Sequence, residues 1–60
     1  MNVRVIKHTK DSITGGFISE GTILTRVSDY GRDMYSGVMG EFCVVVPMDD
    51  CAIILEDIHG

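Results

Sequence analysis

The sequence predicts an all-β protein, and three observations support this class. β-branched residues gather in short runs, such as residues 3–6 and 44–46, and this density favours a pleated strand over a helix. No window of the chain sustains the spacing of apolar side chains that an amphipathic helix needs. Glycine, aspartate and serine interrupt the runs at short intervals. A chain of 60 residues makes one domain, so we expect a single all-β domain over residues 1–60.

Five runs are predicted to form the strands, and they cover residues 2–8, 22–28, 34–39, 41–46 and 51–56. In the second run, simple alternation places Ile23 and Val27 on one face and Leu24 on the other. In the fourth run, three consecutive valines break the alternation, which predicts burial on both faces. In the last run, Ile53 and Leu55 are expected to face the core.

The connections between these runs also have recognisable signatures. Residues 9–21 are polar and turn-rich but include the apolar pair Phe17 and Ile18, which predicts a long loop that folds back on the core. Residues 29–33 form a turn cluster. Pro47 cannot donate to a strand ladder and should end the fourth strand. A short 3₁₀ turn is expected near residues 48–50, with Asp49 as its capping residue.

This order of elements resembles the small Src-homology-3-like barrels. In that family a strand ends in Val/Ile-Pro, a one-turn 3₁₀ corner follows, and the last strand begins; residues 46–53 (Val-Pro-Met-Asp-Asp-Cys-Ala-Ile) are similar. A Lys/Glu-Gly-Asp phrase with two apolar residues usually follows the long loop, and residues 20–24 (Glu-Gly-Thr-Ile-Leu) resemble it. The resemblance implies a five-stranded barrel of the stand-alone type found in bacteria and phages.

The groove residues of the peptide-binding members are missing. The chain has no Trp, and Asp50 lies where those members have a groove Tyr. Their aromatic residues form the surface that holds polyproline helices. The resemblance therefore implies the barrel without the proline-rich ligand.

The charge pattern limits the classes of partner. The formal net charge is −4, and the five Lys and Arg residues are dispersed between positions 4 and 32. Nucleic-acid binding needs clustered basic side chains, so it is disfavoured. The apolar runs at residues 43–46 and 51–55 are far too short for a membrane span, and no signal-peptide core follows the N-terminus. We therefore expect a cytoplasmic protein that does not associate with membranes.

No residue pattern supports catalysis or a metal. Cys43, Cys51, His8 and His59 match no known ligand spacing, and the cysteines are expected to be free thiols in the core. No serine lies in a nucleophile elbow. The sequence therefore predicts a protein that is not an enzyme and has no cofactor or metal.

The remaining candidates are tyrosines, methionines and apolar loop residues, whose types are typical of protein interfaces but equally fit side chains that close the ends of the barrel core. The predicted binding residues are Phe17, Ile18, Tyr30, Met34, Tyr35, Met39, Met48 and Asp50. They favour a non-catalytic protein-binding module, a regulator or inhibitor of a bacterial protein, and an origin in a phage fits its small size. Two alternatives stay open: a nucleic-acid-binding barrel that uses the basic N-terminal half, and a structural protein that forms a homodimer through a strand edge.

Overall fold

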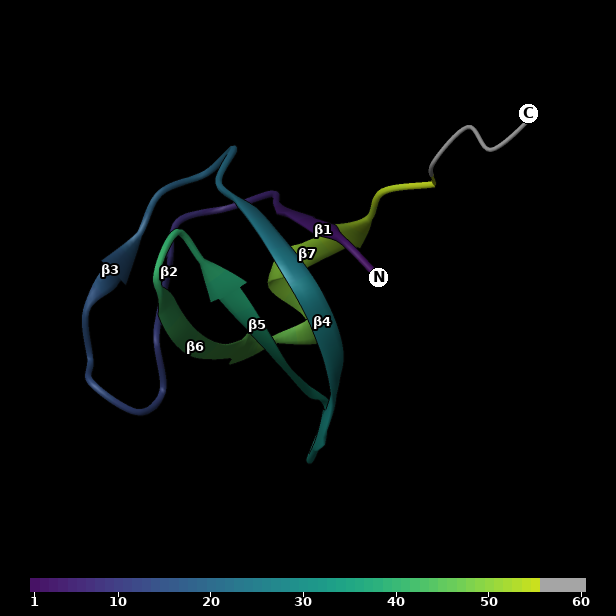
Figure 1. Ribbon diagram of the computed structural model, residues 1–60. Helices are drawn as coiled ribbons and strands as arrows, with labels where there is room; N and C mark the ends of the chain where they lie inside the picture. Colours follow the sequence, from purple (N-terminus) through teal and green to yellow (C-terminus); the bar gives the residue numbers. More distant parts are fainter. Residues whose placement is uncertain (56–60) are drawn as a thin grey trace.

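A computed structural model describes residues 1–55 and shows an all-β protein (Figure 1). The elements are β1 (Val3–Val5), β2 (Thr9–Lys10), β3 (Phe17–Ile18), β4 (Ile23–Gly31), β5 (Met34–Met39), β6 (Phe42–Pro47), the 3₁₀ turn η1 (Met48–Asp50) and β7 (Cys51–Ile53). The five predicted strands are confirmed as β1, β4, β5, β6 and β7. Glu56, the last residue of the fifth predicted strand, and residues 57–60 lie outside the described part.

The five strands other than β2 and β3 form one antiparallel sheet in the order β6-β5-β4-β1-β7. β2 and β3 pair only with each other, within the long loop between β1 and β4. β6 and β7 are the two edges of the sheet and do not pair, so the sheet is not closed into a barrel. Because only η1 separates these two strands in the chain, the sheet must bend until its edges meet at one corner (Figure 1).

A β-bulge in β4 allows this bend. The pairs Thr25↔Val38 and Ser28↔Ser36 enclose one more residue on β4 than on β5. Arg26 lies within the bulge and has a left-handed backbone, with φ of 51°. Bulges increase the twist of a strand and let it bend. β4 pairs with β1 only before the bulge, at Ile23 and Leu24, and with β5 on both sides of it.

The bulge also corrects the predicted faces of the second strand. Leu24 and Val27 are both buried in the core, whereas Ile23 is exposed. The prediction placed Ile23 and Val27 together because it assumed strict alternation. One inserted residue moves Val27 to the other face. A Cβ atom on Gly37, on the facing strand, would lie 2.9 Å from Val27 Cγ2, so only glycine fits there without movement.

One apolar core lies inside the bent sheet. Its buried members are Val3, Val5, Ile18, Leu24, Val27, Val44 and Val46, and Tyr35, Met39 and Cys51 pack against them. Val45 is also buried, which confirms the prediction that the valine run is covered on both faces. Cys43 is exposed, so the prediction that it lies in the core was wrong. Both cysteines are free thiols.

The last strand is less buried than predicted. Ile53 is 50 % exposed and Leu55 is 87 % exposed, so the expectation that both face inward to a closed core was wrong. Ile53 pairs with the buried Val3 and so lies on the core face. Among residues 1–55, however, no strand covers the outer edge of β7. The side chain therefore stays half exposed at the open side of the sheet.

Two turns show how local chemistry set the connections. The 3₁₀ turn at Met48–Asp50 is confirmed, but its N-cap residue is Pro47 and no side chain caps it, so the capping role of Asp49 was wrong. The turn cluster predicted over residues 29–33 is shorter, because β4 continues to Gly31. Arg32 and Asp33 alone make the turn, both with positive φ, as a tight hairpin between twisted strands requires. Within residues 1–55, no helix has the length and apolarity to cross a membrane.

Candidate functional site

Asp11 fastens the long loop to the edge of the sheet. Its carboxylate accepts hydrogen bonds from the Thr14 hydroxyl at 2.8 Å and from the backbone N–H groups of Ile13 and Thr14 at 3.1 and 3.2 Å. It also accepts a hydrogen bond from the backbone N–H of Val45, in β6, at 2.9 Å. The backbone N–H of Ser12 donates to the Val45 carbonyl at 2.8 Å. The loop thus occupies the outer edge of β6 at Val45, a position at which another strand could pair.

Asp11 is only 3 % exposed, yet its environment keeps it ionised. Desolvation raises the pKa of this carboxyl, but the hydrogen bonds from Val45, Thr14 and Ile13 outweigh that effect. The net result is a pKa below the ordinary value of aspartate. Because its oxygens already accept four hydrogen bonds within the chain, Asp11 serves as a structural anchor.

A pocket of about 260 Å³ opens beside this anchor. It lies between the loop with β3 and the hairpin that joins β5 to β6. Both segments are on the left of Figure 1. Its lining residues are Asp11, Thr14, Gly16, Phe17, Ile18, Met39, Phe42, Cys43 and Val44. Drug-sized ligands usually occupy about 300–1,000 Å³, so this pocket suits a single large apolar side chain better.

Two phenylalanines flank the pocket, and each is 69 % exposed. Phe17 is held in place from the loop side. The ring of His8 lies 5.4 Å from its ring, centroid to centroid, and Lys10 Nζ lies 5.5 Å from its centroid. Phe42 starts β6 on the opposite wall. Exposed aromatic side chains that are held in position are typical of binding surfaces.

The pocket also offers backbone hydrogen-bonding groups. The N–H and C=O of Val45 point away from β5, because the loop residues Asp11 and Ser12 bind them. Backbone groups two residues apart on a strand point the same way, so those of Cys43 also face away from β5. No described residue forms a hydrogen bond with this part of the edge. An extended segment could therefore pair with Cys43 while it fills the pocket.

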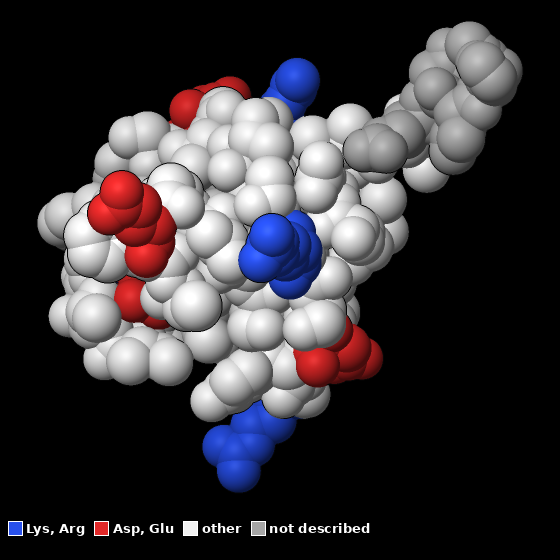
Figure 2. Space-filling model, in the orientation of Figure 1, with Lys and Arg blue, Asp and Glu red and all other residues white. Residues whose placement is uncertain are grey.

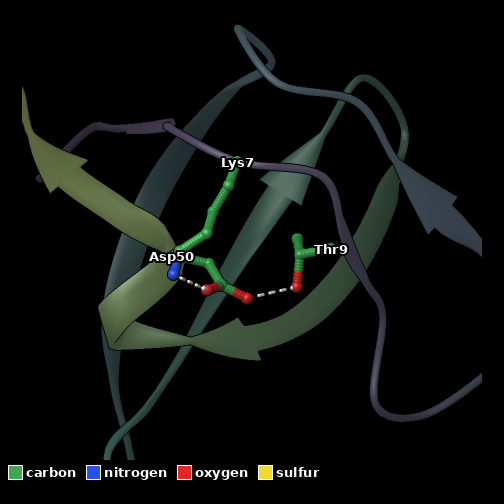
Figure 3. A network of polar contacts seen from close by, with 3 residues as sticks. All are labelled: Lys7, Thr9 and Asp50. Carbon is green, nitrogen blue, oxygen red and sulfur yellow. Dashed lines mark hydrogen bonds and ion pairs between the residues drawn. The ribbon is translucent and has the colours of Figure 1, made fainter.

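Asp50 has a different role from the one predicted. The prediction treated it as a binding residue at the position of a groove aromatic. In the structure, Thr9 Oγ1 donates to Asp50 Oδ2 at 2.7 Å, and Lys7 Nζ lies 3.6 Å from Asp50 Oδ1 (Figure 3). These contacts tie the start of the loop to the corner between β6 and β7. Burial, with a smaller contribution from the Asp50 carboxylate, raises the pKa of the neighbouring Cys51 thiol, which disfavours the reactive thiolate.

The structure separates the predicted binding residues into three groups. Phe17, Ile18 and Met39 line the pocket, although Ile18 is buried and only Phe17 is well exposed. Tyr35 packs against the core. The remaining residues lie near the β4–β5 hairpin and the corner, at the opposite end of β5 from the pocket. They are Tyr30, Met34, Met48 and Asp50. The eight residues therefore do not form one surface.

Three pocket features were missed in the sequence. The Asp-Ser-Ile-Thr phrase of residues 11–14 is a side-chain capping pattern that could have identified Asp11 and Thr14. Phe42 follows a Gly-Glu turn, and such a position at a strand end is often exposed. Nothing in the sequence indicated that Cys43 would lie on an open edge, because that depends on how the loop covers the strand.

The charged side chains do not gather into a basic patch on the face seen in Figure 2. A few blue and red groups are scattered there over a mostly uncharged surface. Such a face suits apolar or mixed contacts with another protein. Phosphate backbones, in contrast, are bound by clustered cations.

No family model matches the chain, and searches of curated proteins and of solved structures gave no significant match. Similarity therefore assigns no family, and the chemistry of the pocket carries the functional inference.

Proposed function

We propose that the chain is a non-catalytic protein-binding module that holds an extended segment of another protein in the pocket between the loop and β6. The observation that carries this proposal is the pair of exposed rings, Phe17 and Phe42, on either side of an apolar pocket. Two rings and a pocket of this size form an anchor site for one apolar side chain. A module of this kind acts by binding a segment of its partner, which fits a regulator or inhibitor.

The fold within this proposal is an open Src-homology-3-like barrel. Three observations support it: the strand order β6-β5-β4-β1-β7, the long loop that folds back over the core, and the 3₁₀ corner before the last strand. The groove of the proline-binding members is replaced here by the Lys7–Asp50–Thr9 contacts. The binding site that we propose lies instead at the loop side of β6.

The expected ligand follows from the chemistry of the rim. The backbone of Cys43 can pair with an extended strand, so main-chain bonds would give part of the affinity and the pocket would select a side chain. Lys10 and His8 lie on the Phe17 side, and Glu41 lies next to Phe42. A segment with an aromatic or branched apolar residue, an acidic group toward Phe17 and a basic group toward Phe42 fits this rim.

A peptide library displayed on particles and selected on the full chain tests the proposal. Selected peptides should share an apolar anchor and should bind Phe42→Ser at least about tenfold more weakly than the wild type, since one wall of the pocket is removed. Tyr30→Ser is the matched control, because Tyr30 is also an exposed aromatic but lies at the other end of the β4–β5–β6 hairpins. Binding that is lost in Tyr30→Ser and retained in Phe42→Ser would overturn the proposed site, and so would a selection that yields no specific peptide.

A further inference from the structure

The outer edge of β7 is uncovered in the described part of the chain and lies across the sheet from β6 and the proposed pocket. Residues 51–55 (Cys-Ala-Ile-Ile-Leu) contain no charge, no proline and no bulge. Natural edge strands are usually protected by one of these features or by a covering segment. Among residues 1–55, no strand covers the outer edge of β7, and Ile53 and Leu55 are exposed there.

The hydrogen bonds to β1 show which backbone groups of β7 remain outside. Ile6 N–H donates to the Asp50 carbonyl, and Ile54 N–H donates to the Asn2 carbonyl. The backbone N–H and C=O groups of the even-numbered residues thus point toward β1, and those of Cys51, Ile53 and Leu55 point outward. The N–H of Cys51 is already used, because it donates to the Met48 carbonyl. The Cys51 carbonyl and both groups of Ile53 are available for another strand.

We propose that this edge binds a second copy of the chain, with the two β7 strands antiparallel around a twofold axis at Ile53. Each Ile53 then exchanges both backbone hydrogen bonds with its counterpart. On either side, the Leu55 N–H of one copy donates to the Cys51 carbonyl of the other. The side chains that become cross-strand neighbours are Ile53 with Ile53, Cys51 with Leu55, and Ala52 with Ile54. All of them are apolar, as favourable cross-strand pairs require.

Two features select a second copy over a different strand. The segment is self-complementary, since the outward groups are symmetric about Ile53 and a twofold interface must pair one surface with itself. It is also uncharged, so it opposes no like charges even though each chain carries a net charge of −4. A charged partner strand would find no complementary charge on residues 51–55.

The proposal goes beyond the pocket function and does not depend on it. β6 and β7 lie at opposite edges of the sheet, so pairing at β7 leaves both pockets of the dimer open. The dimer would present two equivalent binding sites, which raises its avidity for a partner with repeated segments.

Sedimentation velocity of the full chain from about 10 µM to about 1 mM tests the dimer. The wild type should shift from monomer to dimer over this range. Ile53→Lys should weaken the association at least about tenfold, because it places two like charges directly opposite each other. Ile23→Lys is the control, since Ile23 is also a partly exposed isoleucine of this sheet but lies on the interior strand β4. A wild type that stays monomeric, or equal association of the two variants, would overturn the proposal.

Cross-linking fixes the register and covers the case in which Ile53→Lys does not fold. In a Cys43→Ser background, Leu55→Cys should form intermolecular disulfides with native Cys51 under mild oxidation. Ala52→Cys is the control, because its backbone faces β1 and its neighbour across the interface is Ile54 rather than a thiol. Equally rapid cross-linking of both variants would overturn the Ile53-centred register, as would none in Leu55→Cys.

Discussion

The two edge strands of the sheet, β6 and β7, differ in how far the rest of the chain covers them. At β6, the loop residues Asp11 and Ser12 bind both backbone groups of Val45, and the edge stays open at Cys43. At β7, no described residue covers the outer edge, and its side chains are apolar and exposed. An exposed edge is a template for another strand. The difference indicates that β6 is closed to pairing at Val45, whereas the described part of β7 is open to it.

The comparison also shows what covering an edge requires. A carboxylate can cap a strand only if the free energy of its desolvation is offset by hydrogen bonds. Asp11 meets this condition with three backbone N–H groups and one hydroxyl, which arrive from both the loop and β6. One side chain therefore shapes the loop, covers the edge and forms a wall of the pocket.

Removing the cover at β6 should have the largest effect. Asp11→Ala leaves the buried Val45 N–H without a partner and releases the loop, so we expect a loss of about 2–3 kcal/mol in the free energy of unfolding. A chain of this length has roughly 3–9 kcal/mol in total. Urea unfolding measures the loss, and light scattering should report more aggregation, because β6 then resembles β7.

Asp49→Ala is the matched control for this change. Asp49 is exposed and caps nothing, so the variant should unfold within about 0.5 kcal/mol of the wild type. If the two variants lose the same stability, Asp11 is not the cover of the edge.

A substitution on β5 opposite the bulge in β4 should have the next largest effect on stability. In Gly37→Ala, the new methyl group would meet Val27 Cγ2 at 2.9 Å and Leu24 Cβ at 3.1 Å, so the strands must move apart. Overpacking of this kind costs about 1–3 kcal/mol. Gly16→Ala serves as the control, since its nearest neighbour is Thr14 Oγ1 at 3.4 Å. Thermal unfolding that ranks Gly16→Ala as the more damaging change would contradict the close approach of β5 to the bulge.

Acid should weaken the β6 edge by a smaller amount. The pKa of Asp11 is lower in the folded chain than its ordinary value of 3.8, so the unfolded chain binds the proton more readily. The contribution of Asp11 to stability is complete above pH 3.8 and is lost as the pH falls through its folded pKa. The stability difference between the wild type and Asp11→Ala should therefore shrink at low pH. A difference that stays constant would show that the charge of Asp11 contributes nothing.

The sequence predicted the elements better than their faces. Strand positions follow from β-branched runs and turn residues, which are local signals, and the corner at Pro47 was correct for the same reason. The face of Val27 and the burial of Ile53 were wrong, because a bulge and an uncovered edge depend on distant pairing. The register between strands that are far apart in the chain cannot be read from a short stretch of sequence.

The pocket was predicted only in part, for a related physical reason. Phe17 and Met39 were recognised as candidates because their residue types favour interfaces. Asp11 and Cys43 gained their roles only when the loop folded onto β6. Tyr30 and Met34 had the right residue types but lie at the other end of β5.

The smallest expected effect concerns the hairpin that supports the corner where both edges meet. Arg32 and Asp33 have φ values of 57° and 61°, a region in which glycine and asparagine are more comfortable. The Asp33 carbonyl also accepts a hydrogen bond from Met48 N–H, at the start of the corner, and this bond does not need the side chain. Asp33→Gly should raise the free energy of unfolding by about 0.5 kcal/mol, as relief of backbone strain exceeds the added entropy of the unfolded chain. Asp33→Val, a β-branched residue that disfavours positive φ, should lower it in the same urea titration. Opposite signs for these two variants would locate the strain in the backbone of the turn, whereas a loss of stability in both would show that the Asp33 side chain stabilises the turn.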